Sequence, residues 1–188
     1  MTTQPNKQSN AQPIIQKKSL ELRFLLFFLV SYAIFHSAYF MVPDSFLRDV
    51  VFHHGIVAMS QSVIDFAAPG EHVTAVNNKL LSPKAALEVV RGCDGSGALF
   101  LILSAILAFS ATVKRKFLGV VLGVALIYGL NQIRIIALYF IIAYQREWFL
   151  PIHTYFAPTL IVIISCIFFA WWAFGSRRLS HDEQPLVH

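Results

Sequence analysis

Charged residues are scarce in this sequence. Of its 188 residues, 13% are Asp, Glu, Lys or Arg, whereas a soluble domain carries roughly a quarter. Hydrophobic residues make up 56% of the chain. The chain therefore has too few charges to cover the surface of a soluble protein, and too many apolar residues for a disordered one.

Cysteine, glycine and proline are also few. Two cysteines exclude a disulfide framework, and nine glycines and eight prolines without a repeat exclude a collagen-like chain. The net charge of +5 is a value that can indicate nucleic-acid binding, but the basic residues form short clusters beside apolar runs. This pattern is typical of a membrane protein and gives no indication of a nucleic-acid partner.

Four apolar segments approach or exceed the roughly 20 residues that a helix needs to cross a membrane. They cover residues 24–42, 95–113, 117–144 and 156–174, and the one charge they contain is Arg134. We therefore predict an all-α, polytopic membrane protein with four transmembrane helices. The first segment is expected to be an uncleaved anchor, because its apolar run exceeds that of a signal peptide and no cleavage site follows.

The extramembrane residues 43–92 are predicted to contain two parts. Residues 46–68 are amphipathic rather than apolar throughout, so we expect a helix that lies in the membrane interface. After them, the weakly alternating residues 72–76 and the apolar residues 87–90 flank turn-forming residues. This pattern predicts a small, hairpin-like extracytoplasmic cap.

The distribution of charge predicts the orientation in the inner (cytoplasmic) membrane. With four spans and a cytoplasmic N-terminus, the cytoplasmic side carries nine basic and three acidic residues, and the outer side carries six and seven. The positive-inside rule favours this arrangement over one in which residues 46–68 also span. The predicted parts are a disordered cytoplasmic tail (1–19), a membrane-embedded domain (20–175) and a cytoplasmic tail (176–188).

Cys93 begins the chemically informative part of the sequence. It lies in a glycine-rich stretch directly before the second predicted span, where the positive end of a helix dipole lowers a thiol pKa and favours the thiolate. On its own, Cys93 is also compatible with a small structural residue in a turn. Cys166 is in the middle of the last span and is expected to be inert.

Arg134 and His153 are predicted to share the membrane depth of Cys93. Arg134 rises about 25 Å along its span from residue 117, which places it just below the outer surface. A charge inside a span indicates function, although snorkelling toward headgroups is the alternative, and the flanking Asn131 and Gln132 favour a protein-facing side. His153 precedes the last span on the outer face. A nucleophile, a base and a cation are the minimum set for acyl transfer through a thioester.

Other polar residues near these positions have plainer interpretations. Arg91 and Asp94 flank the cysteine, where they either orient a substrate or form a surface ion pair. The histidines of the segment 53–72 lack the spacing of a metal site, so no metal and no cofactor are predicted. The sequence indicates no particular oligomeric state.

Three motifs resemble those of the exosortase/archaeosortase family. They are Cys93-Asp-Gly, the Asn131-x-x-Arg134 pair, and His153-Thr-Tyr-Phe, in an order and spacing that agree with the family from about residue 50 to residue 172. The short length and the Arg-Gly-Cys-Asp-Gly form are most similar to exosortase H.

The resemblance implies a membrane-embedded cysteine peptidase or transpeptidase with Cys93, Arg134 and His153 as catalytic residues. Its substrates would be exported proteins that carry a C-terminal sorting signal, made of a short motif, a transmembrane helix and a basic tail. The signal would be cleaved off, and the remaining protein would be transferred through a thioester to an acceptor. The alternative is a non-enzymatic membrane assembly or export subunit, in which Arg134 pairs with an acid of a partner.

Overall fold

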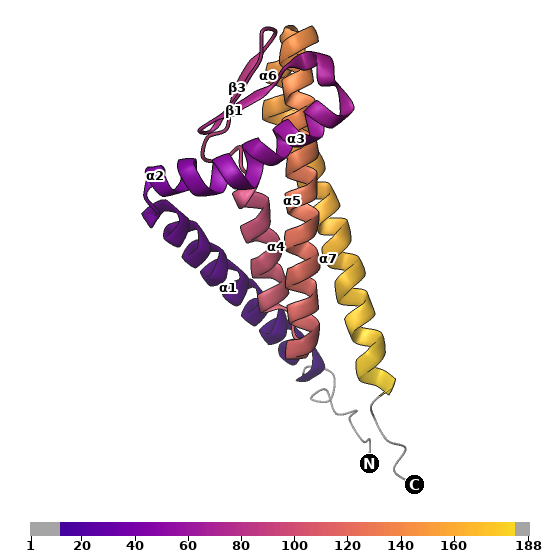
Figure 1. The fold of residues 1–188 in the computed structure, drawn as a ribbon. Helices are drawn as coiled ribbons and strands as arrows, with labels where there is room; N and C mark the ends of the chain where they lie inside the picture. Colours follow the sequence, from indigo (N-terminus) through magenta and orange to yellow (C-terminus); the bar gives the residue numbers. More distant parts are fainter. Residues whose placement is uncertain (1–11, 183–188) are drawn as a thin grey trace, which may run out of the picture.

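The long helices form a bundle with a cap at one end (Figure 1). The structure is a computed structural model that describes residues 12–182, with side chains from residue 19 to residue 175. The bundle consists of α1 (Gln12–Met41), α4 (Ser96–Ala108), α5 (Val113–Tyr144) and α7 (Ala157–Asp182). In this part of the chain, three segments are long and apolar enough to cross a membrane: Ser19–Met41, Val113–Tyr144 and Arg146–Gly175.

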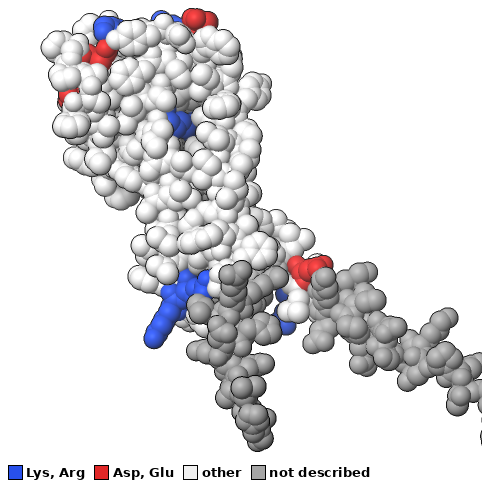
Figure 2. Space-filling view, turned by 90° about the vertical axis from the view of Figure 1, so that its right-hand side faces the viewer, with Lys and Arg blue, Asp and Glu red and all other residues white. Residues whose placement is uncertain are grey.

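The surface of the bundle is apolar. Figure 2 shows the charged side chains gathered mainly toward the two ends of the molecule, with a largely uncharged surface between them. Large apolar side chains such as Phe27, Val121 and Ile163 are exposed along the helices. Such a surface is stable in lipid rather than in water. The chain is a polytopic helical membrane protein.

The helix α4 is shorter than the span predicted over residues 95–113. Its 13 residues rise about 20 Å, less than the hydrocarbon core of about 30 Å. It ends at Ala108 because the chain is extended at Phe109, and Thr112, a residue type preferred at helix N-caps, lies directly before α5. Apolar composition continues through this break, so composition alone could not reveal it. The count of four spans stays a prediction.

The helix α4 packs against α1, α5 and α7. Glycines of α5 allow α7 and α4 to approach this helix closely. On the side of α7, a Cβ on Gly119 would lie 2.6 Å from Nε1 of Trp172. The same indole N–H donates to the backbone oxygen of Arg115 at 3.3 Å. On the next turn, Gly123 contacts Ile102 and Ile106 of α4. These contacts fix α4, and the chain that enters it, relative to α5 and α7.

A helical segment crosses the cap end of α1 and α4 (Figure 1). It consists of α2 (Asp44–Phe46), the π-helix η1 (Leu47–Val57) and α3 (Ala58–Ala67). One face of the segment is buried in the core, while Phe46 and Phe66 are exposed. This arrangement agrees in shape with the interfacial helix predicted over residues 46–68, whose placement in a membrane stays a prediction.

The π-helix is tied to α5 by polar side chains. The backbone oxygen of Gly55 accepts hydrogen bonds from Tyr128 Oη at 2.6 Å and from Gln132 Nε2 at 2.9 Å, and Ser60 Oγ donates to Gln132 Oε1 at 2.7 Å. In a π-helix the hydrogen bonds run from i to i+5 and the helix bulges, which is common at functional sites. Gln132, predicted to face protein, is buried here.

The cap contains a three-stranded antiparallel sheet, in the order β1–β2–β3. Its strands are β1 (Thr74–Val76), β2 (Lys79–Leu81) and β3 (Ala86–Glu88), preceded by the 3₁₀ turn η2 (Pro69–Glu71). Leu80 pairs with Ala75 and Leu87, and the apolar face of the sheet packs on Ile64 and Leu138. β1 and β3 overlap the predicted segments 72–76 and 87–90, whereas the middle strand β2 was not predicted.

A buried carboxylate joins the cap to α5. Glu71 is 6% exposed and accepts hydrogen bonds from Lys84 at 2.8 Å, from Tyr139 at 3.0 Å and from Tyr144. The Lys84 ammonium, followed by the tyrosine hydroxyls, holds the pKa of this carboxyl below its usual value. The network therefore contributes most to stability when Glu71 is ionised. Since β3 leads directly into the Cys93 turn, the network also positions that turn.

Helices extend into both segments that were predicted to be tails. α1 begins at Gln12, inside the tail predicted over 1–19, and residues 1–11 lie outside the described residues. A proline at position 13 suits the first turn of a helix, and the lysines that follow are good helix formers. α7 continues to Asp182, inside the tail predicted over 176–188.

Candidate active site

The structure brings Cys93, Arg134 and His153 together from three different parts of the chain. Cys93 lies in the turn before α4, Arg134 in α5, and His153 in the π-helix η4 (Ile152–Phe156). Cys93 Sγ is 3.5 Å from His153 Nε2. On the other side of the ring, Arg134 Nη2 is 3.4 Å from Nδ1 and 3.4 Å from the backbone oxygen of His153. The imidazole therefore lies between the thiol and the guanidinium.

A short helical connection positions His153. After α5, the 3₁₀ turn η3 (Arg146–Trp148) and α6 (Phe149–Pro151) lead into η4 and then α7. The imidazole stacks on the ring of Phe149, with 5.1 Å between centroids and an angle of 10° between planes. This stacking leaves the ring edge, with both nitrogens, facing Cys93 and Arg134.

Arg134 is a buried cation, with 9% of its surface exposed. Burial at this position argues against the snorkelling alternative, since a snorkelling side chain extends its charge into the headgroups. In the described part of the chain, its Nε has no hydrogen-bond partner. Burying a donor without a partner costs about 1–3 kcal/mol, so an unpaired N–H in this cluster indicates a place for a ligand atom.

Asp94 shapes the turn that carries Cys93. Its Oδ1 accepts from the backbone N–H of Gly92 at 3.1 Å and from Ser96 Oγ at 3.0 Å. Its Oδ2 accepts from the hydroxyl of Tyr39, in α1, at 2.7 Å. Asp94 therefore holds the turn to α1 and forms no surface ion pair with Arg91. The sequence analysis did not identify Tyr39 as part of the site, because a single tyrosine in an apolar span has no pattern that distinguishes it.

Arg91 has a structural place, away from the thiol. Its guanidinium donates to the backbone oxygens of Tyr39, at 2.7 Å, and of Val42, and its Nε donates to Asp44 at 2.7 Å. A cation beside the last carbonyls of a helix is favourable, because these carbonyls have no partner within the helix. Arg91 thus caps the C-terminal end of α1.

The neutral thiol is the resting form that the surroundings of Cys93 favour. Burial raises the pKa of the thiol above its usual value, Arg134 partly opposes this, and Asp94 adds to it. The prediction of a lowered thiol pKa is therefore wrong for this structure. α4 begins at Ser96, three residues after Cys93, and the influence of a helix dipole falls off within its first turn. For this thiol to act as a nucleophile, a base would have to remove its proton.

Asn131 lies beneath the Cys93 turn. It is 2% exposed, and its Oδ1 has no partner among the described residues. Gly95, with φ of +81°, passes directly over it: an added Cβ would lie 3.1 Å from Asn131 Cγ. Asn131 thus supports the backbone of the turn rather than contacting the thiol.

Replacing Gly95 by alanine is expected to destabilise the protein. A left-handed backbone costs a residue with a Cβ about 1–2 kcal/mol, and the methyl group would press on Asn131. Gly97→Ala is the matched control, since nothing lies within 4 Å of a Cβ there. Thermal unfolding of the purified variants should show a lowered midpoint for Gly95→Ala alone. Equal midpoints would contradict the tight fit of the turn on Asn131.

The histidines outside this site are dispersed. His53 Nδ1 contacts the backbone oxygen of Asn77 at 2.7 Å, and the His53 and His54 rings pack on each other. Among the side chains that the structure describes, residues 19–175, no group of three or more His, Cys, Asp or Glu has the geometry of a metal site.

The fold and site define a class: a polytopic helical membrane protein with a cysteine, a histidine and an arginine gathered at its capped end. A family model, described as transmembrane exosortase (Exosortase_EpsH), matches residues 16–170. The chain therefore belongs to the exosortase family, which in general is a family of cysteine-peptidase-like transpeptidases. No curated protein and no solved structure matches it. The family predicted from the motifs is confirmed, and the subtype, exosortase H, stays a prediction.

Proposed function

We propose that the chain is a four-span, inner-membrane cysteine peptidase/transpeptidase. It cleaves C-terminal sorting signals from exported proteins on the extracytoplasmic face and transfers the proteins to an acceptor. The observation that carries the proposal is the 3.5 Å distance between Cys93 Sγ and His153 Nε2, with Arg134 on the far side of the imidazole. A thiol and a base within reach, with the base oriented by a third group, are the requirements for nucleophilic catalysis.

In the first half of the reaction, His153 takes the thiol proton and Cys93 Sγ attacks the carbonyl that precedes the substrate's transmembrane helix. The carbonyl oxygen becomes an oxyanion, which Arg134 stabilises by charge and by N–H donation. The protonated imidazole then gives its proton to the leaving amine as the C–N bond breaks. A thioester joins Cys93 to the remaining protein.

In the second half, an acceptor replaces the sulfur. His153 removes a proton from an amine, a hydroxyl group or water, which attacks the thioester carbonyl and releases Cys93. With water as acceptor the outcome is hydrolysis, and with the other acceptors it is transfer. Asn131 and Asp94 hold the Cys93 turn in place throughout.

Arg134 also controls which nitrogen of His153 holds the proton. When Nη2 donates to Nδ1, the neutral ring has its proton on Nε2, which then donates to sulfur. When Nη2 donates to the backbone oxygen instead, the neutral ring can hold its proton on Nδ1, and Nε2 then accepts the thiol proton. Both acceptors lie 3.4 Å from Nη2, so a small movement of the guanidinium exchanges them.

The alternative of a non-enzymatic subunit receives less support from this geometry. It requires Arg134 to pair with an acid of another protein, but the guanidinium is buried against His153. A partner could reach it only after His153 had moved away.

The proposal is tested by capturing the thioester. Membranes with the full chain and a tagged substrate should contain a covalent enzyme–substrate species that neutral hydroxylamine removes. Mass spectrometry should then find a hydroxamate at the C-terminus of the released protein, since hydroxylamine replaces the natural acceptor. Continued processing in hydroxylamine without any hydroxamate would rule out a thioester.

The four-span topology is tested by cysteine accessibility, in a chain that lacks Cys93 and Cys166. Asn78 is too buried to carry a probe, so exposed Lys79 is used for the cap and exposed Lys114 for the other end. An impermeant thiol reagent outside the cell should label Lys79→Cys and leave Lys114→Cys unmodified. The reverse pattern, or labelling of both, would contradict the orientation.

A further inference from the structure

A cavity lies at the end of the bundle opposite to the cap. It has a volume of about 880 Å³ and is lined by α1, the end of α4, the start of α5 and Phe169 of α7. The short α4 is the reason for the space: it ends at Ala108, while α1, α5 and α7 continue past it (Figure 1). The cavity is far from Cys93, which lies at the other end of α4.

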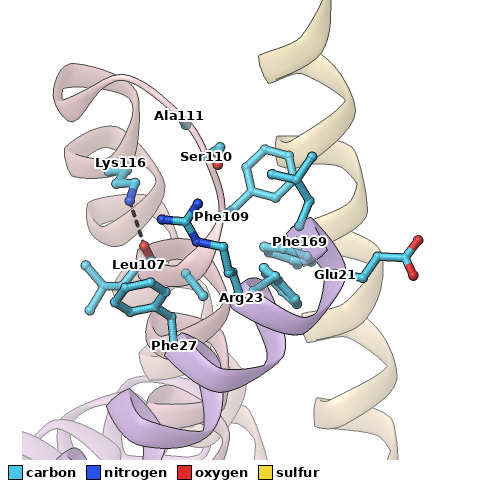
Figure 3. A pocket seen from close by; sticks show the side chains of 12 residues that line it. Glu21, Arg23, Phe27, Leu107, Phe109, Ser110, Ala111, Lys116 and Phe169 are labelled. Carbon is cyan, nitrogen blue, oxygen red and sulfur yellow. Dashed lines mark hydrogen bonds between the residues drawn. The ribbon is translucent and has the colours of Figure 1, made fainter. Parts of the chain in front are cut away.

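Two cations line this cavity, and the acid beside them faces away. Figure 3 shows the Arg23 guanidinium between Lys116 and Ser110, whereas the Glu21 carboxylate points away from the pair. Lys116 Nζ donates to the backbone oxygen of Leu107 at 2.6 Å, at the end of α4. Within residues 19–175, the structure gives Arg23 no hydrogen-bond or ion-pair partner. The cavity therefore presents an unpaired guanidinium with a second positive charge beside it.

Apart from Glu21 and Ser110, the rest of the lining is apolar. Phe27, Phe109 and Phe169 (Figure 3), together with Phe24, form an aromatic wall. Arg23 lies near the start of the candidate span Ser19–Met41, and Lys116 near the start of Val113–Tyr144. Both cations are thus at the level of lipid headgroups, and the aromatic wall extends from there toward the hydrocarbon core.

The geometry points to a binding site for an anionic phospholipid, with its phosphate on Arg23 and Lys116 and an acyl chain along the phenylalanines. Basic pockets between transmembrane helices are typical sites for such headgroups. A guanidinium binds phosphate through paired N–H donors, and a soluble anion would leave the aromatic wall uncovered. A basic peptide would be repelled by both cations.

The test is native mass spectrometry of the purified full chain in a non-ionic detergent, titrated with phosphatidylglycerol. Phosphatidylcholine, which is zwitterionic, and glycerol 3-phosphate, which has no acyl chains, are the comparison ligands. We expect phosphatidylglycerol to bind preferentially, and Arg23→Gln to weaken its binding about fivefold, as the loss of one basic contact predicts. Lys114→Gln, which is exposed and lies two residues from Lys116 but outside the cavity lining, is the matched control and should bind as the unaltered chain does.

Each of the other outcomes overturns the proposal. Equal binding of phosphatidylcholine would remove the role of charge, and an equal loss in Lys114→Gln would indicate general surface attraction. Glycerol 3-phosphate that competes as well as the lipid would indicate a site for a soluble anion. Arg23→Gln is expected to fold, because the side chain forms no hydrogen bond within the described residues, and an unchanged unfolding midpoint checks this.

Discussion

Replacing Cys93 by alanine is expected to stop the processing of sorting signals, by about 10³-fold or more, and to let the precursor accumulate. Removal of a nucleophile is among the most damaging changes to an enzyme, because the remaining groups have no covalent step to assist. The other cysteine, Cys166, is exposed on α7 and cannot substitute for it. Immunoblots of a tagged substrate, normalised to the amount of enzyme in membranes, provide the measurement.

Cys166→Ala is the matched control for this experiment. It removes the same atoms from a position outside the site, so processing should be unchanged. Cys93→Ser adds a second comparison. A thiol enzyme should lose processing, because a serine hydroxyl ionises far less readily than a thiol and is a poor nucleophile in its place, whereas an assembly subunit should tolerate the substitution. Normal processing in either variant of Cys93 would eliminate the thiol mechanism and favour the non-enzymatic alternative.

The convergence of the site residues could be predicted because depth along a membrane helix follows from residue counts. A constant rise per residue places Arg134 about 25 Å along the predicted span from residue 117, in the half of α5 nearer the cap. Cys93 and His153 lie in connections at that same end, so three weak signals indicated one plane. The distances between their side chains could not be predicted, because they depend on the π-helix η4 and on the stacking of His153 upon Phe149.

The roles of the neighbouring polar residues were harder to predict, because they depend on tertiary contacts. Arg91 and Asp94 are close in sequence to Cys93, yet their partners are at the end of α1. Nothing local to the sequence indicates that α1 passes beside this turn. In the same way, the pKa of Cys93 follows from burial by the surrounding chain rather than from the helix that begins after it.

The break after α4 shows a further limit of reading spans from composition. Residues 95–113 carry no charge and are mostly apolar, so hydropathy describes a full span, but a span also requires an unbroken helical backbone. Ser110 and Thr112 offer side-chain oxygens that favour caps and turns over helix interiors. The resulting short helix leaves the cavity around Arg23 and Lys116, which composition gave no reason to expect.

Replacing Arg134 by lysine is expected to slow processing by about a hundredfold while the protein still accumulates in membranes. Lysine keeps the formal charge but lacks the planar fork, so its single nitrogen cannot contact His153 and also present a donor to the oxyanion from the position of a second guanidinium nitrogen. A buried lysine also loses its proton more readily. Loss of one oxyanion donor costs about 10²–10³ in rate.

The measurement for Arg134→Lys is pulse-chase processing of a tagged substrate, divided by the abundance of the enzyme in membranes. Arg146→Lys is the matched control: Arg146 is exposed, at the capped end, and outside the site, so the same exchange should leave processing unchanged. If Arg134 only anchored α5 in the membrane, lysine would replace it without loss, since both side chains extend to the interface. Near-normal turnover in Arg134→Lys would therefore assign the oxyanion to other donors and leave Cys93 and His153 as a dyad.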